Sequence, residues 1–219
     1  IEFKGLFTLS LAIYNLIYAT ILFKKFGLDK NAVYLLIGLV LTFVTLTIPI
    51  QFEGNQITLF WSAEAVLLFW LSHKSKISLF KLGAMVVQFL SIISLIIDWD
   101  KQYRFSNNEL SIVLNPIFIT GIVVVASLIA TYFLLKKENE STFIFKIDFD
   151  PVFYRNGITW VALILGYFVG IFEIIHQTGQ NLENSSSALS LSVGYHFIFS
   201  TVFIYFGLKS KEELVQKLA

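Results

Sequence analysis

The 219-residue sequence contains no cysteine, only three prolines and twelve glycines, and few charged side chains. The absence of cysteine excludes a disulfide scaffold, a cysteine nucleophile and thiolate-bound zinc or iron–sulfur clusters. Charged residues make up 14% of the chain, whereas a soluble globular domain carries about 25%. A net charge of +1 supplies no basic face for nucleic acid, so we expect no nucleic-acid partner.

Hydrophobic residues are what the sequence has in excess: they account for 56% of it, with 23 phenylalanines. A bilayer core about 30 Å thick needs roughly 17–25 apolar residues of helix, because lipid offers the backbone no hydrogen bonds. Seven stretches meet or nearly meet this length: 5–23, 32–50, 57–72, 77–98, 111–135, 157–177 and 187–208. The sequence therefore predicts one all-α domain over 1–219, a polytopic transmembrane helical bundle whose main partner is the lipid bilayer.

Charged residues and a proline at the ends of the apolar runs support several of these span boundaries. Lys24 and Lys25 follow the first apolar run, and Pro49 is expected to end the second because proline cannot continue the helical hydrogen-bond ladder. The stretch 98–100, Asp-Trp-Asp, closes the fourth run with an aromatic residue at the depth of a membrane interface. These features predict short loops between most of the spans.

Lysine and arginine gather on one side of the predicted bundle. Thirteen of the 16 basic residues fall before the second span, around loops three and five, or after the last span, and only Lys4, Lys101 and Arg104 fall on the other side. Cytoplasmic loops carry such an excess. We therefore predict an N-terminus outside the cell and a cytoplasmic C-terminus.

The longest loop, 136–155, contains an alternating pattern. Phe143, Phe145, Ile147 and Phe149 are separated by polar residues, and a period of two is typical of an extended segment. The pattern predicts a short strand or an extended segment at the cytoplasmic interface. A docking site for a soluble partner is the alternative.

Polar and aromatic side chains inside the predicted spans are candidates for lining a pocket. An ionisable residue at the bilayer centre costs roughly 2.5–3.5 kcal/mol, so such residues usually face a cavity or a partner. The pocket candidates are Trp61, Glu64, Gln88, Asn115, Glu173, His176 and His196.

Glu64 lies near the middle of the third span, with Trp61 one turn away on the same face. Its carboxyl group is either a proton or cation site in a cavity or a hydrogen-bonded link between helices. His196 has the same two interpretations, as a proton relay or as a packing residue. Gln88 begins a polar stripe along the fourth span.

The sixth span contains a Glu-x-x-His pair, Glu173 and His176, a spacing that binds metals in some helical bundles. The sequence has no second pair of this kind, so we expect no metal and no cofactor. Gly166 and Gly170 form a small-xxx-small pair that permits close helix approach. Asn115, just before Pro116, is expected to cap the fifth span, with a kink lining a pocket as the alternative.

In the predicted topology the acidic and histidine candidates and Asn115 lie in the central or outer half of the membrane. This asymmetry predicts a polar pocket that opens outward above an apolar cytoplasmic floor.

Three blocks resemble one family. They are Ile-Pro-Ile at 48–50 leading into Leu-Phe-Trp-Ser-Ala-Glu-Ala at 59–65, Leu-Asn-Pro-Ile-Phe-Ile-Thr at 114–120, and Lys-Ser-Lys-Glu-Glu-Leu at 209–214. Together they resemble the domain of unknown function 2339 family of polytopic bacterial membrane proteins, with Ala65 where the family pattern has glycine. The resemblance implies a multi-pass protein of the bacterial inner (cytoplasmic) membrane, here a fragment of a longer member, and it implies no particular activity.

Two functions fit these features. A transport or pore module for a small solute or lipid-linked ligand is favoured by the central glutamate and the outward polar set. A seven-span sensor or scaffold that passes a signal to the cytoplasmic side is the alternative, with further spans of a longer chain or copies of itself as partners. The sequence has no G-x-S-x-G or H-E-x-x-H motif, so it favours both over an enzyme.

Overall fold

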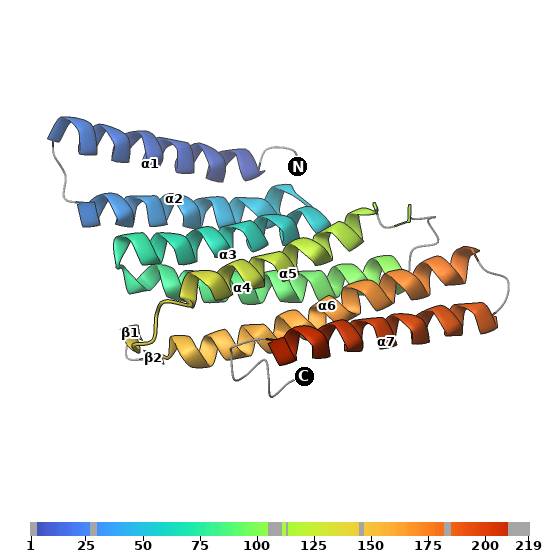
Figure 1. Ribbon diagram of the computed structural model, residues 1–219. Helices are drawn as coiled ribbons and strands as arrows, with labels where there is room; N and C mark the ends of the chain where they lie inside the picture. Colours follow the sequence, from blue (N-terminus) through green and yellow to red (C-terminus); the bar gives the residue numbers. More distant parts are fainter. Residues whose placement is uncertain are drawn as a thin grey trace.

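The structure is a computed structural model that describes residues 4–26, 30–104, 111–112, 114–144, 147–181 and 185–209. These residues form seven α-helices, a π-helical turn and one small hairpin (Figure 1). The elements are α1 (Lys4–Phe26), α2 (Lys30–Gln51), α3 (Asn55–Ser75), α4 (Ser78–Trp99), η1 (Asp100–Arg104), α5 (Pro116–Leu135), β1 (Thr142–Ile144), β2 (Ile147–Phe149), α6 (Pro151–Asn181) and α7 (Ser185–Lys209). Each helix contains most or all of one predicted span, so the all-α prediction is confirmed.

Five of the described helices are long and apolar enough to cross a membrane. The apolar stretches are Ala32–Gln51, Ser78–Tyr103, Pro116–Leu135, Pro151–Gln180 and Ser186–Tyr205. The apolar part of α1, Phe7–Leu22, is shorter. α3 is outside this set because serine, glutamate, histidine and lysine lower its hydropathy. The five helices indicate a membrane protein.

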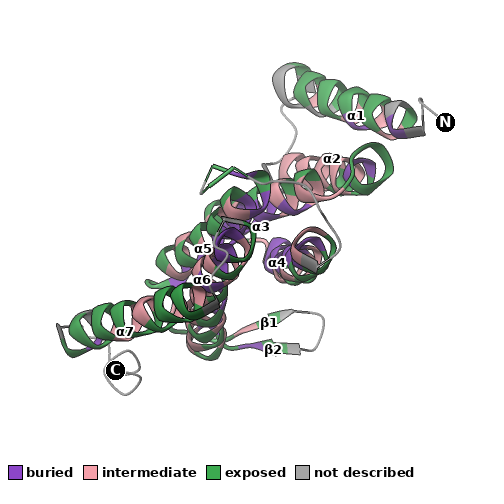
Figure 2. Cartoon of the chain, turned by 90° about the vertical axis from the view of Figure 1, so that its right-hand side faces the viewer, coloured by how far each residue is buried: buried purple, intermediate pink, exposed green. Residues whose placement is uncertain are grey.

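Consecutive helices run antiparallel (Figure 1), and all of them except α4 form a single row. The order across the row is α1, α2, α3, α5, α6, α7, with α4 lying on one face against α3 and α5 (Figure 2). The chain is therefore an open row of helices with a thickened middle. Because the helices alternate in direction, successive connections lie at alternate ends of the helix axes.

Along the direction of the helix axes the bundle has two ends. Basic residues gather at one of them, which we call the basic end. The α3–α4 turn, the hairpin and the start of α6 lie there (Figure 1). Lys74 and Lys76 lie at the end of α3, Lys137 lies between α5 and the hairpin, and Arg155 lies near the start of α6. The opposite end holds the α2–α3 turn and the start of α5. The alternation of helices thus brings together basic residues that are up to about eighty positions apart in the sequence.

Buried apolar side chains form two clusters in the thickened middle of the row. One, around Phe69 and Phe80, joins α3 to α4 near the basic end. The other, around Leu95 and Val124, joins α4, α5 and α6 toward the opposite end. Large apolar side chains on the outer helices stay exposed, and none of the apolar stretch of α7 is buried. An apolar surface this extensive fits contact with lipid.

Capping explains where two helices begin. The Asn115 side chain accepts a hydrogen bond from the Phe118 backbone N–H at 2.8 Å, ahead of Pro116 at the first helical position, so the predicted cap of α5 is confirmed. The span predicted from 157 begins earlier, at Pro151. There Asp150 Oδ1 accepts from the Val152 N–H at 2.8 Å and caps α6.

Two helix ends differ from the prediction. Pro49 lies inside the last turn of α2, which continues to Gln51, because a proline so close to the end disrupts little of the hydrogen-bond ladder. α4 ends at Trp99 as predicted, but its helical backbone continues as η1. That continuation places Tyr103 beside α6.

The alternating segment in the long loop forms an antiparallel hairpin, which confirms the predicted extended structure. Thr142 pairs with Phe149, Phe143 with Asp148, and Ile144 with Ile147. Phe149 is buried beneath the Lys81 ammonium group, 5.2 Å from Nζ to the ring centroid, whereas Phe143 is 77% exposed. The hairpin therefore packs under the first turn of α4.

Candidate functional site

The seven site residues predicted from the sequence lie at four separate positions in the structure. Trp61 and Glu64 lie on α3 in the middle of the row, and Gln88 lies between α4 and α5. Asn115, Glu173 and His176 lie together toward the opposite end. His196 lies alone on α7. Only one of the four places therefore combines residues from different helices in the predicted set.

Glu64 is a buried carboxyl group in the middle of α3, 3% exposed. Its Oε1 accepts a hydrogen bond from Thr45 Oγ1 on α2, and its Oε2 is buried without a hydrogen-bond partner. One turn away, the indole Nε1 of Trp61 is likewise buried without a partner. An unpaired donor and an unpaired acceptor thus lie one turn apart on one helix.

Glu64 also lines a groove of about 490 Å³ between α2, α3 and α4. The rest of the lining is almost entirely apolar, and Gly38 lets the Phe80 ring of α4 pack close to α2, because a Cβ atom there would lie 2.8 Å from Phe80 Cε1. Exposed leucines at its rim, including Leu35, Leu39 and Leu46, place its opening on the apolar outer surface. The groove is therefore accessible from the side of the row.

The direction of this groove differs from the sequence prediction. The α4 residues in its lining are 79–87, the half of α4 that begins at the basic end. The groove thus extends from Glu64 toward the basic end, where the sequence predicted an apolar floor. On that half the groove is lined by α2 and by α4, which lies out of the row (Figure 2).

Glu173 is the centre of a buried hydrogen-bond cluster that joins η1, α5 and α6. Tyr103 Oη donates to Glu173 Oε2 at 3.1 Å, and Asn115 Nδ2 lies 2.9 and 2.8 Å from the two carboxyl oxygens. Gln177 Nε2 donates to Glu173 Oε1 at 3.0 Å. His176 stacks beside Tyr103 with ring centroids 5.3 Å apart, and its Nε2 is buried without a partner.

This arrangement is suited to holding helices together rather than to binding an ion. Both oxygens of Glu173 already accept hydrogen bonds, so neither is directed into a cavity. Among the described residues, no group of three histidine, aspartate or glutamate side chains is placed to hold a metal ion. The cluster is a polar link between helices in an apolar setting.

Gln88 and His196 have separate roles. Gln88 connects α4 to α5, donating to Ser127 Oγ at 3.1 Å and accepting from Thr131 Oγ1 at 3.2 Å. The His196 ring is exposed on α7 and packs edge-on against Tyr167, 5.9 Å between centroids. His196 therefore lies away from both carboxyl groups.

Several contributing residues were not predicted. Thr45 lies on a different helix from Glu64, and a single sequence gives no signal for that pairing. Tyr103 lies beyond the expected end of the fourth span. Gln177 could have been identified, because it lies four residues after Glu173 on the same helix face. Thr58 was also not predicted: its Oγ1 donates at 2.6 Å to Oδ2 of Asp98, which belongs to the polar stripe predicted along the fourth span.

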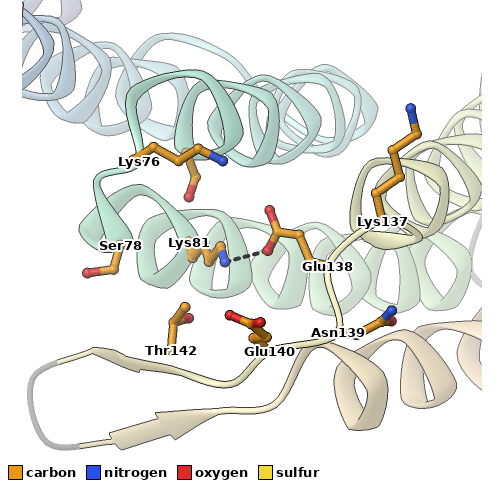
Figure 3. A pocket seen from close by; sticks show the side chains of 9 residues that line it. Lys76, Ser78, Lys81, Lys137, Glu138, Asn139, Glu140 and Thr142 are labelled. Atoms are coloured by element: carbon orange, nitrogen blue, oxygen red, sulfur yellow. Dashed lines mark hydrogen bonds and ion pairs between the residues drawn. The ribbon is translucent and has the colours of Figure 1, made fainter.

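A second polar region lies at the basic end, between the α3–α4 turn and the segment after α5 (Figure 3). Lys81 Nζ donates to Glu138 Oε2 at 2.5 Å, and His73 Nδ1 lies 3.1 Å from Glu138 Oε1. Burial alone would raise the pKa of the Glu138 carboxyl, but these two partners outweigh it and hold that pKa below its ordinary value. Glu138 is thus an anchored anion beside a cavity of about 420 Å³.

Comparisons with known proteins give no relative. No family model, no curated protein and no solved structure matches the chain. The resemblance to the domain of unknown function 2339 family therefore depends on the three sequence blocks alone.

Proposed function

We propose that the chain is a transport module of a bacterial cytoplasmic membrane that carries a small solute or lipid-linked ligand by way of Glu64. The observation that carries the proposal is the Glu64 Oε2 atom, buried without a partner at the edge of an apolar groove. A buried polar group without a hydrogen bond costs about 1–3 kcal/mol, so a ligand that donates to it recovers that free energy.

The groove favours a particular class of ligand. Its lining would hold an alkyl or prenyl chain, and the carboxyl group would accept from a hydroxyl or amine at the end of that chain. Leucines at the rim lie on the surface that lipid would cover, so such a ligand reaches the groove from the bilayer without crossing water. A lipid-linked ligand with a donor group satisfies both features.

The proposed orientation has the basic end in the cytoplasm and the N-terminus outside. It is supported by the excess of lysine and arginine at that end. In this orientation the groove lies in the cytoplasmic half of the membrane. The ligand would then be taken from the inner leaflet.

The absence of cysteine permits a direct binding test. Thr42 lines the groove, so Thr42→Cys introduces a single thiol whose labelling by a small maleimide reports access. We expect dodecylamine to slow labelling about tenfold in the reconstituted chain and dodecanoate to have little effect. Adding Glu64→Leu should abolish the protection because the acceptor is lost.

Ser127→Ala is the matched control, since it removes a buried hydroxyl group outside the groove and should keep the protection. Equal protection by the amine and the carboxylate, or protection that survives Glu64→Leu, contradicts a ligand held by Glu64. No protection by either probe favours the second candidate, a membrane scaffold. That candidate is supported by Gln88, Glu173 and Asp98, each of which forms a hydrogen bond with a side chain from a neighbouring element.

A further inference from the structure

The cavity at the basic end has walls of both charges. It lies between the end of α3, the start of α4 and the segment leading into β1, and Figure 3 shows its side chains. Lys76, Lys81 and Lys137 supply positive charge, and Glu138 and Glu140 supply negative charge. Its volume of about 420 Å³ is in the range of small-ligand sites.

Part of this charge is already neutralised. Lys81 and Glu138 form an ion pair, with only 9% and 18% of their side-chain surfaces exposed. Lys76, Lys137 and Glu140 are exposed, and the structure gives none of them an ion pair within its described residues. Two positive charges and one negative charge therefore remain for a ligand.

The cavity also offers uncharged hydrogen-bonding groups. The first turn of α4 begins beside it at Ser78, and the capping position, Ile77, supplies no side-chain acceptor for the free N–H groups there. Thr142 Oγ1, in the opposite wall, is buried without a partner. Free helix N–H groups and an unpaired hydroxyl both suit a phosphate group.

The location fits a lipid headgroup. The cavity lies where α3 ends and α4 begins, next to the start of the apolar stretch Ser78–Tyr103, which is long enough to cross a membrane. Phe143 on β1 and Phe153 on the first turn of α6 are 77% and 79% exposed, so the elements that follow the cavity in sequence carry large apolar rings on their surface. In the proposed orientation the cavity lies on the cytoplasmic side, where basic pockets between helices are typical headgroup sites.

We propose that this cavity binds the headgroup of a phospholipid that carries an amine, such as phosphatidylethanolamine. The phosphate lies between Lys76, Lys137 and the start of α4, and the ammonium group lies against Glu140. An anionic headgroup without an amine supplies no positive charge to pair with the Glu140 carboxylate. The site is separate from the Glu64 groove and does not depend on transport.

Native mass spectrometry of the full chain, stripped of lipid and then supplied with one lipid at a time, tests the proposal. We expect phosphatidylethanolamine to bind about tenfold more tightly than phosphatidylglycerol. Lys76→Gln combined with Lys137→Gln should weaken both lipids. Glu140→Gln should remove the preference for the amine, a loss of about 1.4 kcal/mol for a tenfold change.

Lys74→Gln is the matched control, because it removes one positive charge at the basic end outside the cavity. It should leave both affinities unchanged. Binding of phosphatidylethanolamine that survives the double lysine substitution overturns the proposal, as does a preference that survives Glu140→Gln. Inorganic phosphate that displaces the lipid at equal concentration identifies a free-anion site instead of a headgroup site.

Discussion

A single polar side chain in this protein, that of Asn115, both caps a helix and links two helices. Asn115 accepts from the start of α5 through its side-chain oxygen and donates to Glu173 through its amide nitrogen. It is fully buried, so neither interaction can be replaced by water. One amide side chain thus fixes both where α5 begins and how α5 lies against α6.

Asn115→Ala is expected to cost about 2–4 kcal/mol of unfolding free energy. The loss combines a helix cap, worth about 1 kcal/mol, with a buried carboxyl deprived of a donor, about 1–3 kcal/mol. Asn115→Asp keeps an acceptor for the cap but cannot donate to Glu173, so it should be no more stable than the alanine variant. Reversible unfolding in mixed detergent measures both.

Gln177→Leu removes a side chain that donates to Glu173 and leaves the cap of α5 in place, so it should cost less than Asn115→Ala. Equal stability of Asn115→Ala and the unsubstituted chain would show that the cluster does not hold the helices.

Pairs of helices depend on small residues where they approach. Gly166 and Gly170, one turn apart on α6, have different surroundings although the sequence presents them as one motif. A Cβ atom at Gly170 would lie 2.5 Å from Tyr195 Cζ on α7, whereas a Cβ atom at Gly166 would lie 4.0 Å from its nearest neighbour, Val125 Cγ1. Only one glycine of the pair is therefore required by packing.

Gly170→Ala is expected to destabilise the α6–α7 contact by about 1–3 kcal/mol, because the Tyr195 ring must move. Gly166→Ala, the matched control, should be neutral or stabilising by up to about 1 kcal/mol, since alanine favours the helix. The same unfolding measurement compares them. Equal costs for the two substitutions would contradict the close approach of Tyr195 to Gly170.

The sequence predicted the helix positions wherever a run of apolar residues determines where a helix begins and ends. The early start of α6 was not, because residues 151–156 include polar side chains and the deciding feature is the Asp150 cap. The placement of α4 outside the row could not be inferred, since a single sequence does not state which helices are neighbours. For this reason the expected single pocket became separate sites at Glu64 and Glu173.

At the scale of the whole molecule, the alternation of helices gives the row two chemically distinct ends. Cysteine scanning can test the proposed orientation without background labelling, because the chain has no cysteine. Glu53→Cys places a thiol in the α2–α3 turn, and Ser141→Cys places one before the hairpin at the basic end. Both positions are exposed.

In intact cells, a membrane-impermeant maleimide should label Glu53→Cys and should label Ser141→Cys only after the membrane is permeabilised. The excess of positive charge at the basic end is the physical reason. The reverse pattern would place the basic end outside. Equal labelling of both positions in intact cells would contradict a bilayer lying between the two ends.

The open row also has a consequence for how the molecule comes apart. α1 packs mainly on α2 and α7 mainly on α6, so each outer helix is held by a single neighbour. Disassembly should then proceed from both edges inward, as in repeat proteins, with α3, α4 and α5 separating last. Detachment of α2 would destroy the groove at Glu64, whereas the cavity at Lys76 would survive it. The groove at Glu64 should therefore be lost at an earlier stage of unfolding than the cavity at Lys76.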